Sequence, residues 1–103
     1  MSGFERFLPS AQLLARACQE HGVARLRLFG SAATDRFDPD RSDLDFLVDF
    51  LPGRSDRLAD YLGLRDELAR LTGMSVDLVI ADSMRNPYFR ASVLDGAKEL
   101  YAA

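Results

Sequence analysis

The sequence predicts an α/β (α+β) fold, a small mixed β-sheet flanked by helices, and two observations predict it. Apolar residues recur at helical spacing in residues 10–22 and 55–72, and they alternate at strand spacing in the segments between and after them. The resulting order is αβ(α)βαβαβ, and strands that alternate with helices favour a sheet covered by helices. With 103 residues, we expect one domain over residues 1–103.

The first predicted helix begins after Ser10, a residue type that caps helix N-termini, and ends near Gly22. The residues expected on its buried face are Leu13, Leu14, Ala17, Cys18 and His21. His21 is the only histidine and lies in the last turn, where a favourable interaction with the helix dipole explains it better than a metal or catalytic role.

Two strands are predicted next, at residues 24–29 and 43–50. In the first, Leu26 and Leu28 face one way while Arg25 and Arg27 face the other. The second has a period of two, with an apolar face that must be core and an opposite face that is acidic apart from Leu47. Aspartate is disfavoured in strands, so this acidic face calls for an explanation.

The remaining elements follow from turn and breaker residues. Pro52-Gly53 forms a turn before a helix at residues 55–72, on which Leu58, Tyr61, Leu62, Leu68 and Ala69 recur at helical spacing and which Gly73 ends. A third strand is predicted at residues 75–81, a short helix at 88–94 after Pro87, and an edge strand at 97–101. Residues 34–41 read as a polar loop.

Composition excludes several classes of protein. The net charge of −3 gives no basic footprint for nucleic acid, so direct nucleic-acid binding is not expected. Cys18 is the only cysteine, so we expect no internal disulfide, a thiol that packs in the core and a reducing compartment. No apolar run reaches the roughly 20 residues of a membrane span, and the N-terminus does not read as a secretory signal. These features predict a cytoplasmic protein.

Three carboxylates carry the functional interpretation. Asp43 and Asp45 are two apart on a strand, so they project side by side and repel unless a cation lies between them. Asp77 lies in another strand with similar apolar flanks, which a neighbouring position in the sheet would bring to the same ion. All-oxygen ligands suit Mg²⁺, Mn²⁺ or Ca²⁺. The structural alternative is that Asp43 and Asp45 are merely exposed at a sheet edge.

A turn after the first strand adds a candidate phosphate site. Gly30-Ser31 follows the apolar residues 26–29, and a turn at this place presents backbone N–H groups and a hydroxyl to an anion. Such a pair alone usually forms only a turn. Together with the carboxylates it predicts a site for a nucleoside triphosphate and a divalent ion.

These segments resemble a known family. Residues 28–31 (Leu-Phe-Gly-Ser), 42–48 (Ser-Asp-Leu-Asp-Phe-Leu-Val) and 76–79 (Val-Asp-Leu-Val) are similar to the core of the DNA polymerase β-type nucleotidyltransferases, and more narrowly to the minimal nucleotidyltransferases (MNT) of prokaryotes. The resemblance runs from about residue 11 to 101, nearly the whole chain.

The resemblance implies specific roles and partners. Asp43, Asp45 and Asp77 would be metal ligands, with Asp77 also the base for the acceptor hydroxyl, and Gly30 and Ser31 would hold the β- and γ-phosphates of ATP. Some minimal members are antitoxins that transfer AMP from ATP to a tyrosine of a HEPN-domain toxin. The resemblance therefore implies an Mg²⁺-dependent protein adenylyltransferase whose acceptor is a HEPN-domain toxin or another protein.

The sequence departs from the family after the Gly-Ser turn. Many relatives continue with Arg-Ala-Arg-Gly, whereas residues 32–35 here are Ala-Ala-Thr-Asp, so the positive charge for a triphosphate must come from Arg27, Arg36 or Arg41 or be missing. The chain also has no room for the helical domain of larger relatives, so a second copy or a protein partner must supply those contacts.

Two other functions stay open. The missing arginines favour a non-catalytic antitoxin-like module that neutralises a partner by forming a complex. A metal-dependent nuclease shares the acidic cluster but does not explain Gly30-Ser31, and the acidic net charge speaks against it.

Overall fold

The computed structural model describes residues 8–29, 43–81 and 96–103. In this part the chain forms, in order, α1 (Ala11–Glu20), β1 (Val23–Phe29), β2 (Leu44–Phe50), α2 (Arg57–Thr72), β3 (Val76–Ile80) and β4 (Lys98–Ala102). Each of these elements begins and ends within two residues of the bounds predicted for it from the sequence. The polar loop at 34–41, any helix after Gly30 and the short helix at 88–94 fall outside the described residues.

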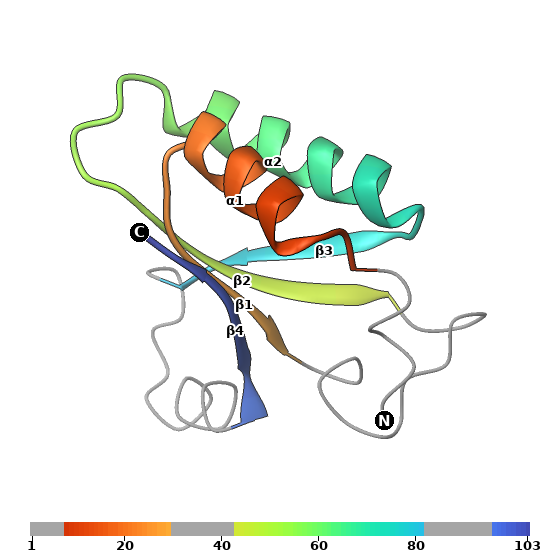
Figure 1. Ribbon diagram of the computed structural model, residues 1–103. Coiled ribbons are helices and arrows are strands. Elements are labelled where there is room, and N and C mark those ends of the chain that lie inside the picture. The colour runs from red at the N-terminus through yellow and green to blue at the C-terminus, as the bar shows by residue number, and fades with distance from the viewer. Residues whose placement is uncertain (1–7, 30–42, 82–95) are drawn as a thin grey trace.

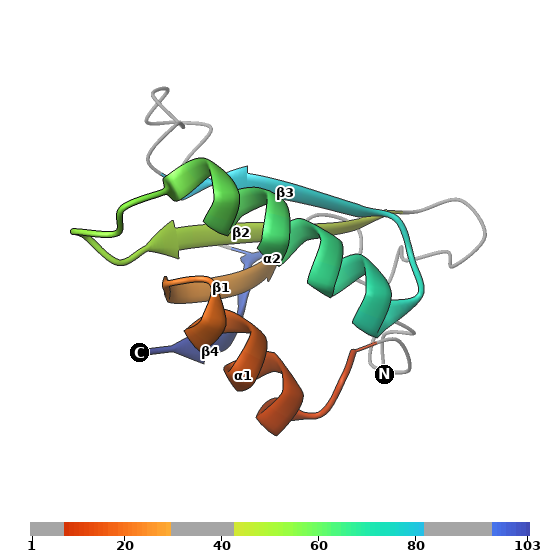
Figure 2. The same cartoon turned by 90° about the horizontal axis from the view of Figure 1, so that it is seen from above.

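The four strands form one mixed sheet in the order β3-β2-β1-β4. The pairs β1–β2 and β1–β4 are antiparallel, and β2–β3 is parallel. β4 lies at one edge, as predicted for residues 97–101, and β3 lies at the other. Both described helices cover the same face of this sheet (Figure 1), and the view from above shows α1 nearer to β4 and α2 nearer to β3 (Figure 2).

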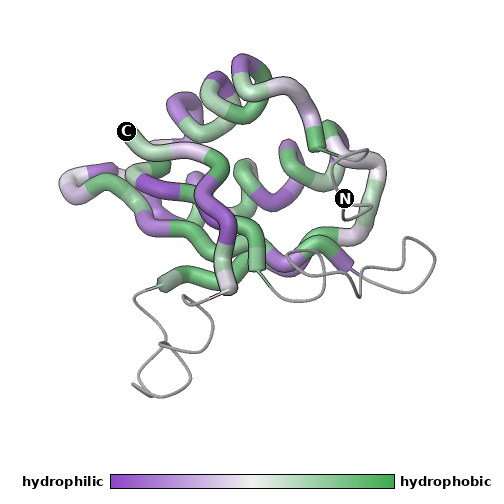
Figure 3. The backbone as a smooth tube through the Cα atoms, turned by 60° about the horizontal axis from the view of Figure 1, so that its bottom comes forward, coloured by the Kyte–Doolittle hydropathy of each residue, from purple (hydrophilic) through white to green (hydrophobic). Residues whose placement is uncertain are grey.

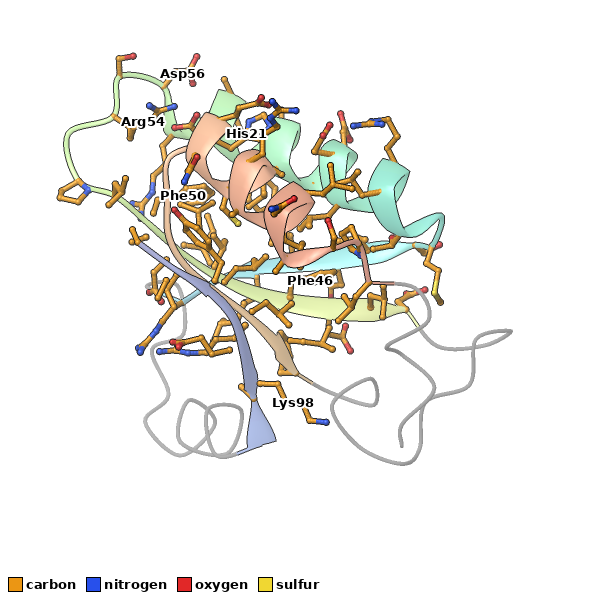
Figure 4. The ribbon with its side chains drawn as sticks, in the orientation of Figure 1. His21, Phe46, Phe50, Arg54, Asp56 and Lys98 are labelled. Atoms are coloured by element: carbon orange, nitrogen blue, oxygen red, sulfur yellow. The ribbon has the colours of Figure 1, made fainter. Side chains whose placement is uncertain are left out.

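The core lies between the helices and the sheet. Phe46 is fully buried there, and Figure 4 shows it between the helical layer and β2, with Lys98 on the far side of the sheet. The apolar face predicted for the second strand is confirmed as core, as the buried side chains Leu44, Phe46, Val48 and Phe50 belong to one cluster with residues of α1, α2 and β1. Hydrophilic and hydrophobic residues alternate along the helices in Figure 3, as expected for elements with one buried side.

The cap of α1 was predicted correctly, but one residue of its buried face was not. The Ser10 side chain accepts a hydrogen bond from the Leu13 N–H at 3.3 Å, and Gly22, directly after the C-cap residue, has φ +66°. Leu13 itself is 45% exposed, whereas Leu14, Ala17 and Cys18 are buried. With ten residues, α1 buries a narrow stripe, and Leu13 lies beside it.

The buried face of α2 also differs from the prediction. Leu58 and Leu62, expected in the core, are 67% and 38% exposed, while Asp60 and Thr72 are buried. The leucines of this helix recur in more than one register, so helical spacing alone does not select the inner face. Leu64, Leu68 and Asp60 take that face because they share a stripe of period four.

Asp60 is buried because an arginine from the preceding turn reaches it. Arg54 donates hydrogen bonds from Nε and Nη2 to the two Asp60 carboxylate oxygens, both at 2.9 Å, and from Nη2 to the Glu20 carbonyl at 3.4 Å. The arginine bonds hold the pKa of Asp60 below its ordinary value, against the effect of burial. Figure 4 shows Arg54 near His21, at the end of α1. This cluster ties the end of α1 to the start of α2.

The single thiol behaves as predicted from the sequence. Cys18 is free and fully buried, and burial raises its pKa to about 12, so it acts as a small apolar core residue. Neither α1 nor α2, the helices of the described ranges, has the length and hydropathy that a membrane crossing needs.

Candidate active site

The candidate site lies on the face of the sheet opposite to α1 and α2. Residues of β2 alternate between the two faces, so Asp45, Leu47 and Asp49 share this face. We call it the open face because neither α1 nor α2 covers it, although Leu47 is buried there. Antiparallel pairing sets Phe29 of β1 opposite Asp45, and parallel pairing sets Asp77 of β3 on its other side. The candidate site therefore lies on the acidic face that was predicted for the second strand.

Asp45 and Asp77 are brought together by strand register. They are direct partners in the β2–β3 pair, so their side chains leave the same face of adjacent strands, about 4.8 Å apart. The sequence predicted that a neighbouring strand would bring Asp77 to Asp45, and the register confirms it.

Asp43, directly before the N-terminal end of β2, completes the acidic group. It lies one residue before the strand begins and is exposed, as is Asp77, whereas Asp45 is half-buried. Burial raises the pKa of Asp45 above its ordinary value, and the negative charges of Asp77 and then Asp43 raise it further. The three carboxylates therefore sense one another electrostatically, with Asp45 at the centre.

The burial of Asp45 has a structural source. A second apolar cluster lies on the open face, with Leu47 and Ala81 almost fully buried and Phe29 and Val79 packed against them. Phe29 is the register partner of Asp45, and Leu47 is the next residue on the same face. This apolar side of the site lowers the solvation of Asp45, which strengthens charge interactions there.

The predicted phosphate-binding residues Gly30 and Ser31 lie outside the described residues, as do Arg36 and Arg41. Phe29, the residue before Gly30, is described and stands opposite Asp45. The chain therefore enters the Gly30-Ser31 segment directly beside the carboxylates. Arg27 lies on the open face two residues earlier, where its Nη1 is 3.8 Å from Oδ2 of Asp49.

The donor chemistry of the group fits a hard divalent cation, because all its ligating atoms are carboxylate oxygens. Within residues 8–29, 43–81 and 96–103, no group of three or more His, Cys, Asp or Glu side chains is arranged to hold a metal ion. Burial first, and then repulsion by Asp77 and Asp43, raise the pKa of Asp45, and a bound cation would relieve both penalties. Ligand type and electrostatics fit Mg²⁺ or Mn²⁺, whereas side-chain placement does not form a closed cage.

Comparison with known proteins identifies the family. The model of the nucleotidyltransferase domain family matches residues 10–100. The chain belongs to this family. The expectation of a nucleotidyltransferase enzyme from three short motifs is thereby confirmed.

Individual relatives indicate to which group of the nucleotidyltransferase family this chain is most similar. A protein of Methanocaldococcus jannaschii named as a proposed protein adenylyltransferase is 36% identical over 78 residues, which cover 73% of this chain and 74% of the relative. A solved structure described as a proposed minimal nucleotidyltransferase superposes with a TM-score of 0.70 at 37% identity and covers 84% of this chain and 85% of the other. This nucleotidyltransferase is a minimal one.

A more distant likeness supports the fold alone. A structure of a tri-AMPylated HEPN toxin of Shewanella oneidensis in complex with an MNT antitoxin matches with a TM-score of 0.58 at 20% identity, over 91% of this chain and 74% of the other.

Phe29 was missed in the sequence as part of the site. The sequence pattern marks it as the last residue of an apolar run, and only the β1–β2 register shows that it flanks Asp45. Its position directly before Gly30-Ser31 was the available signal.

Proposed function

We propose that this nucleotidyltransferase transfers AMP from ATP to a hydroxyl group of a partner protein, as a single domain over residues 1–103. The observation that carries the proposal is the register pairing of Asp45 with Asp77, with Asp43 close enough to raise the pKa of Asp45. A group of repelling carboxylates on an otherwise ordered sheet is costly unless a cation is used there.

The roles follow from position. Asp43 and Asp45 would hold Mg²⁺ or Mn²⁺, with Asp77 as a third ligand, and Gly30 and Ser31 would bind the β- and γ-phosphates. A bound divalent ion neutralises triphosphate charge and polarises the α-phosphate. Asp77 accepts the proton of the acceptor hydroxyl, whose oxygen forms the new bond to the α-phosphorus. The bond from that phosphorus to the bridging oxygen breaks, and pyrophosphate leaves.

We propose a HEPN-domain toxin, or another protein with an accessible hydroxyl, as the acceptor. The family resemblance implies it, and the relative at 36% identity is named for protein adenylylation. A toxin–antitoxin role in the cytoplasm would follow.

The test is label transfer from α-labelled ATP with Mg²⁺ into proteins of the source organism. Wild type should label a discrete acceptor, and Asp43→Asn and Asp45→Asn should not. Asp66→Asn is the control, because it makes the same substitution at an exposed aspartate of α2, on the other side of the sheet from the three carboxylates. Labelling that persists in both site variants would refute the assignment.

A non-catalytic antitoxin module is the second candidate, favoured by the lack of arginine in residues 32–35. It predicts that wild type labels nothing, while a partner protein co-purifies equally with wild type and the Asp43→Asn variant.

A further inference from the structure

A tyrosine of α2 contacts the strand that carries Asp77. The Tyr61 hydroxyl donates a hydrogen bond to the main-chain carbonyl of Leu78 at 2.8 Å. Leu78 directly follows Asp77 in β3 and is buried in the core, against which the Tyr61 ring also packs. The hydroxyl therefore fixes the main chain next to the acidic side chain.

β3 needs such a contact because it is an edge strand. In the described sheet it has β2 as its neighbour on one side, and the ladder to β2 covers five residues. Successive residues of a strand direct their N–H and C=O groups to alternate sides, so an edge strand leaves half of these groups outside the ladder. The Tyr61 bond gives one of the β3 carbonyls a partner from the helical layer.

The register of β3 determines the position of Asp77 more strongly than it determines the position of Asp45. Asp45 lies on a central strand that is paired on both sides, by β1 and by β3. A slip of β3 by one residue would turn Asp77 into the core, and a slip by two would move it about 6.6 Å along Asp45's strand. Fraying of β3 has the same effect on a smaller scale.

We propose that Tyr61 is a positioning residue for catalysis, which holds β3 in the register that sets Asp77 opposite Asp45. This inference rests on the proposed function, since it assumes that Asp77 acts on the acceptor hydroxyl. Tyr61 itself touches the strand from the helical side, on the face of the sheet away from the carboxylates, and therefore acts only through β3.

The experiment compares Tyr61→Phe with wild type. The variant keeps the ring and its packing and removes only the hydroxyl. We expect kcat for AMP transfer to fall between about fivefold and a hundredfold, because small misplacements of a catalytic group are costly. The KM for ATP should stay within about twofold, since Asp45 lies on a strand that is paired on both sides and does not depend on this bond. A kcat equal to that of wild type would overturn the positioning role.

Tyr101→Phe is the matched control. Tyr101 lies on β4, the opposite edge strand, and its ring packs partly buried against the same core. The substitution is identical, yet the affected strand carries none of the three carboxylates. A loss of kcat as large in Tyr101→Phe as in Tyr61→Phe would show a general effect of destabilisation and would overturn the inference.

Hydrogen exchange separates this inference from the proposed function. In Tyr61→Phe, those amides of residues 76–80 that bond to β2 should exchange about fivefold faster, as expected for the loss of about 1 kcal/mol from one hydrogen bond. The amides of residues 24–29 should stay protected. Unchanged exchange at residues 76–80 would overturn the clamp whatever the activity. A wild type that transfers no AMP would instead refute the proposed function, and with it the catalytic meaning of the clamp.

Discussion

Asp45 and Asp77 stand directly opposite each other on adjacent parallel strands, on the face of the sheet that α1 and α2 leave uncovered. Burial of Asp45, and the like charge of Asp77 beside it, raise the pKa of Asp45, so its charged form works against folding. The pair makes sense as a site that is incomplete without a cation and substrate phosphates. The charge of Asp45 that the proposed function needs is therefore the same charge that destabilises the metal-free fold.

The first prediction is that Asp45→Asn abolishes AMP transfer and makes the metal-free protein more stable at neutral pH. A raised native pKa means that the folded state disfavours the charged carboxylate, so the penalty develops as pH rises above the ordinary range of aspartate. The gain should stay below about 1 kcal/mol, because the site is partly exposed.

Thermal unfolding in a chelating buffer at pH 7 and near pH 3.5 measures this effect. The stability advantage of Asp45→Asn should shrink at the lower pH, because the raised pKa of Asp45 favours its uncharged form there. Asp66→Asn, on the exposed side of α2, should show neither the gain nor its pH dependence. A variant less stable than wild type at pH 7 would contradict the repulsion.

The second prediction concerns the ion pair of Asp60 with the partly exposed Arg54. Asp60→Asn should destabilise the fold by about 1 kcal/mol at pH 7, because it weakens two hydrogen bonds and leaves Arg54 without its charge partner. The native pKa of Asp60 is lowered, so its contribution is fully present above the ordinary aspartate pKa and is lost as pH falls toward the native value.

Denaturant unfolding from pH 7 down to pH 2.5 checks this prediction. Wild type should lose stability over the acidic part of the range, and the curve of Asp60→Asn should be flatter there. Glu67→Gln is the control. Glu67 accepts a hydrogen bond from Arg70 on the same helix, and the Arg70 side chain is exposed. Parallel curves for wild type and Asp60→Asn would rule out the linkage.

The third prediction uses the buried thiol. With its pKa raised to about 12, Cys18 should resist an aromatic disulfide reagent in the native protein at pH 8, since only the thiolate reacts. Modification should proceed at the rate of protein opening and become fast in denaturant. Rapid labelling of the native state would show that α1 opens far more readily than its packing against the core implies.

The sequence predicted those parts of the fold and site that depend on local pattern. The alternation in residues 43–50 was enough to place Asp45 on the face away from the core, and Ser10 and Gly73 marked helix ends correctly. The predictions that were wrong concern features that local pattern does not determine: contacts between residues distant in sequence, and the choice of which side of a helix faces the core. Nothing near Asp60 predicts its burial, which requires Arg54 to fold over Gly22 at the end of α1. Leu58 was misplaced because a leucine-rich helix offers several apolar stripes.

The last prediction tests the contact between α1 and α2 at a glycine in mid-helix. Gly63 lies within α2, where alanine normally stabilises by roughly 0.5–1 kcal/mol. A Cβ at this position would lie 2.6 Å from Cε1 and 2.8 Å from Nδ1 of His21, so the ring must move. We expect Gly63→Ala to destabilise the wild type by about 1 kcal/mol through overpacking.

Combining this change with His21→Ala isolates the cause. Without the imidazole, Gly63→Ala should stabilise the protein by its helical propensity, so the sign of its effect on the free energy of unfolding reverses between the two backgrounds. Denaturant unfolding of the four proteins gives the coupling energy directly. The same sign in both backgrounds would mean that the ring yields without cost, and that the glycine is not required by the packing of His21. A reversal would explain why the helix keeps its least favourable non-proline residue at the point where the two helices meet.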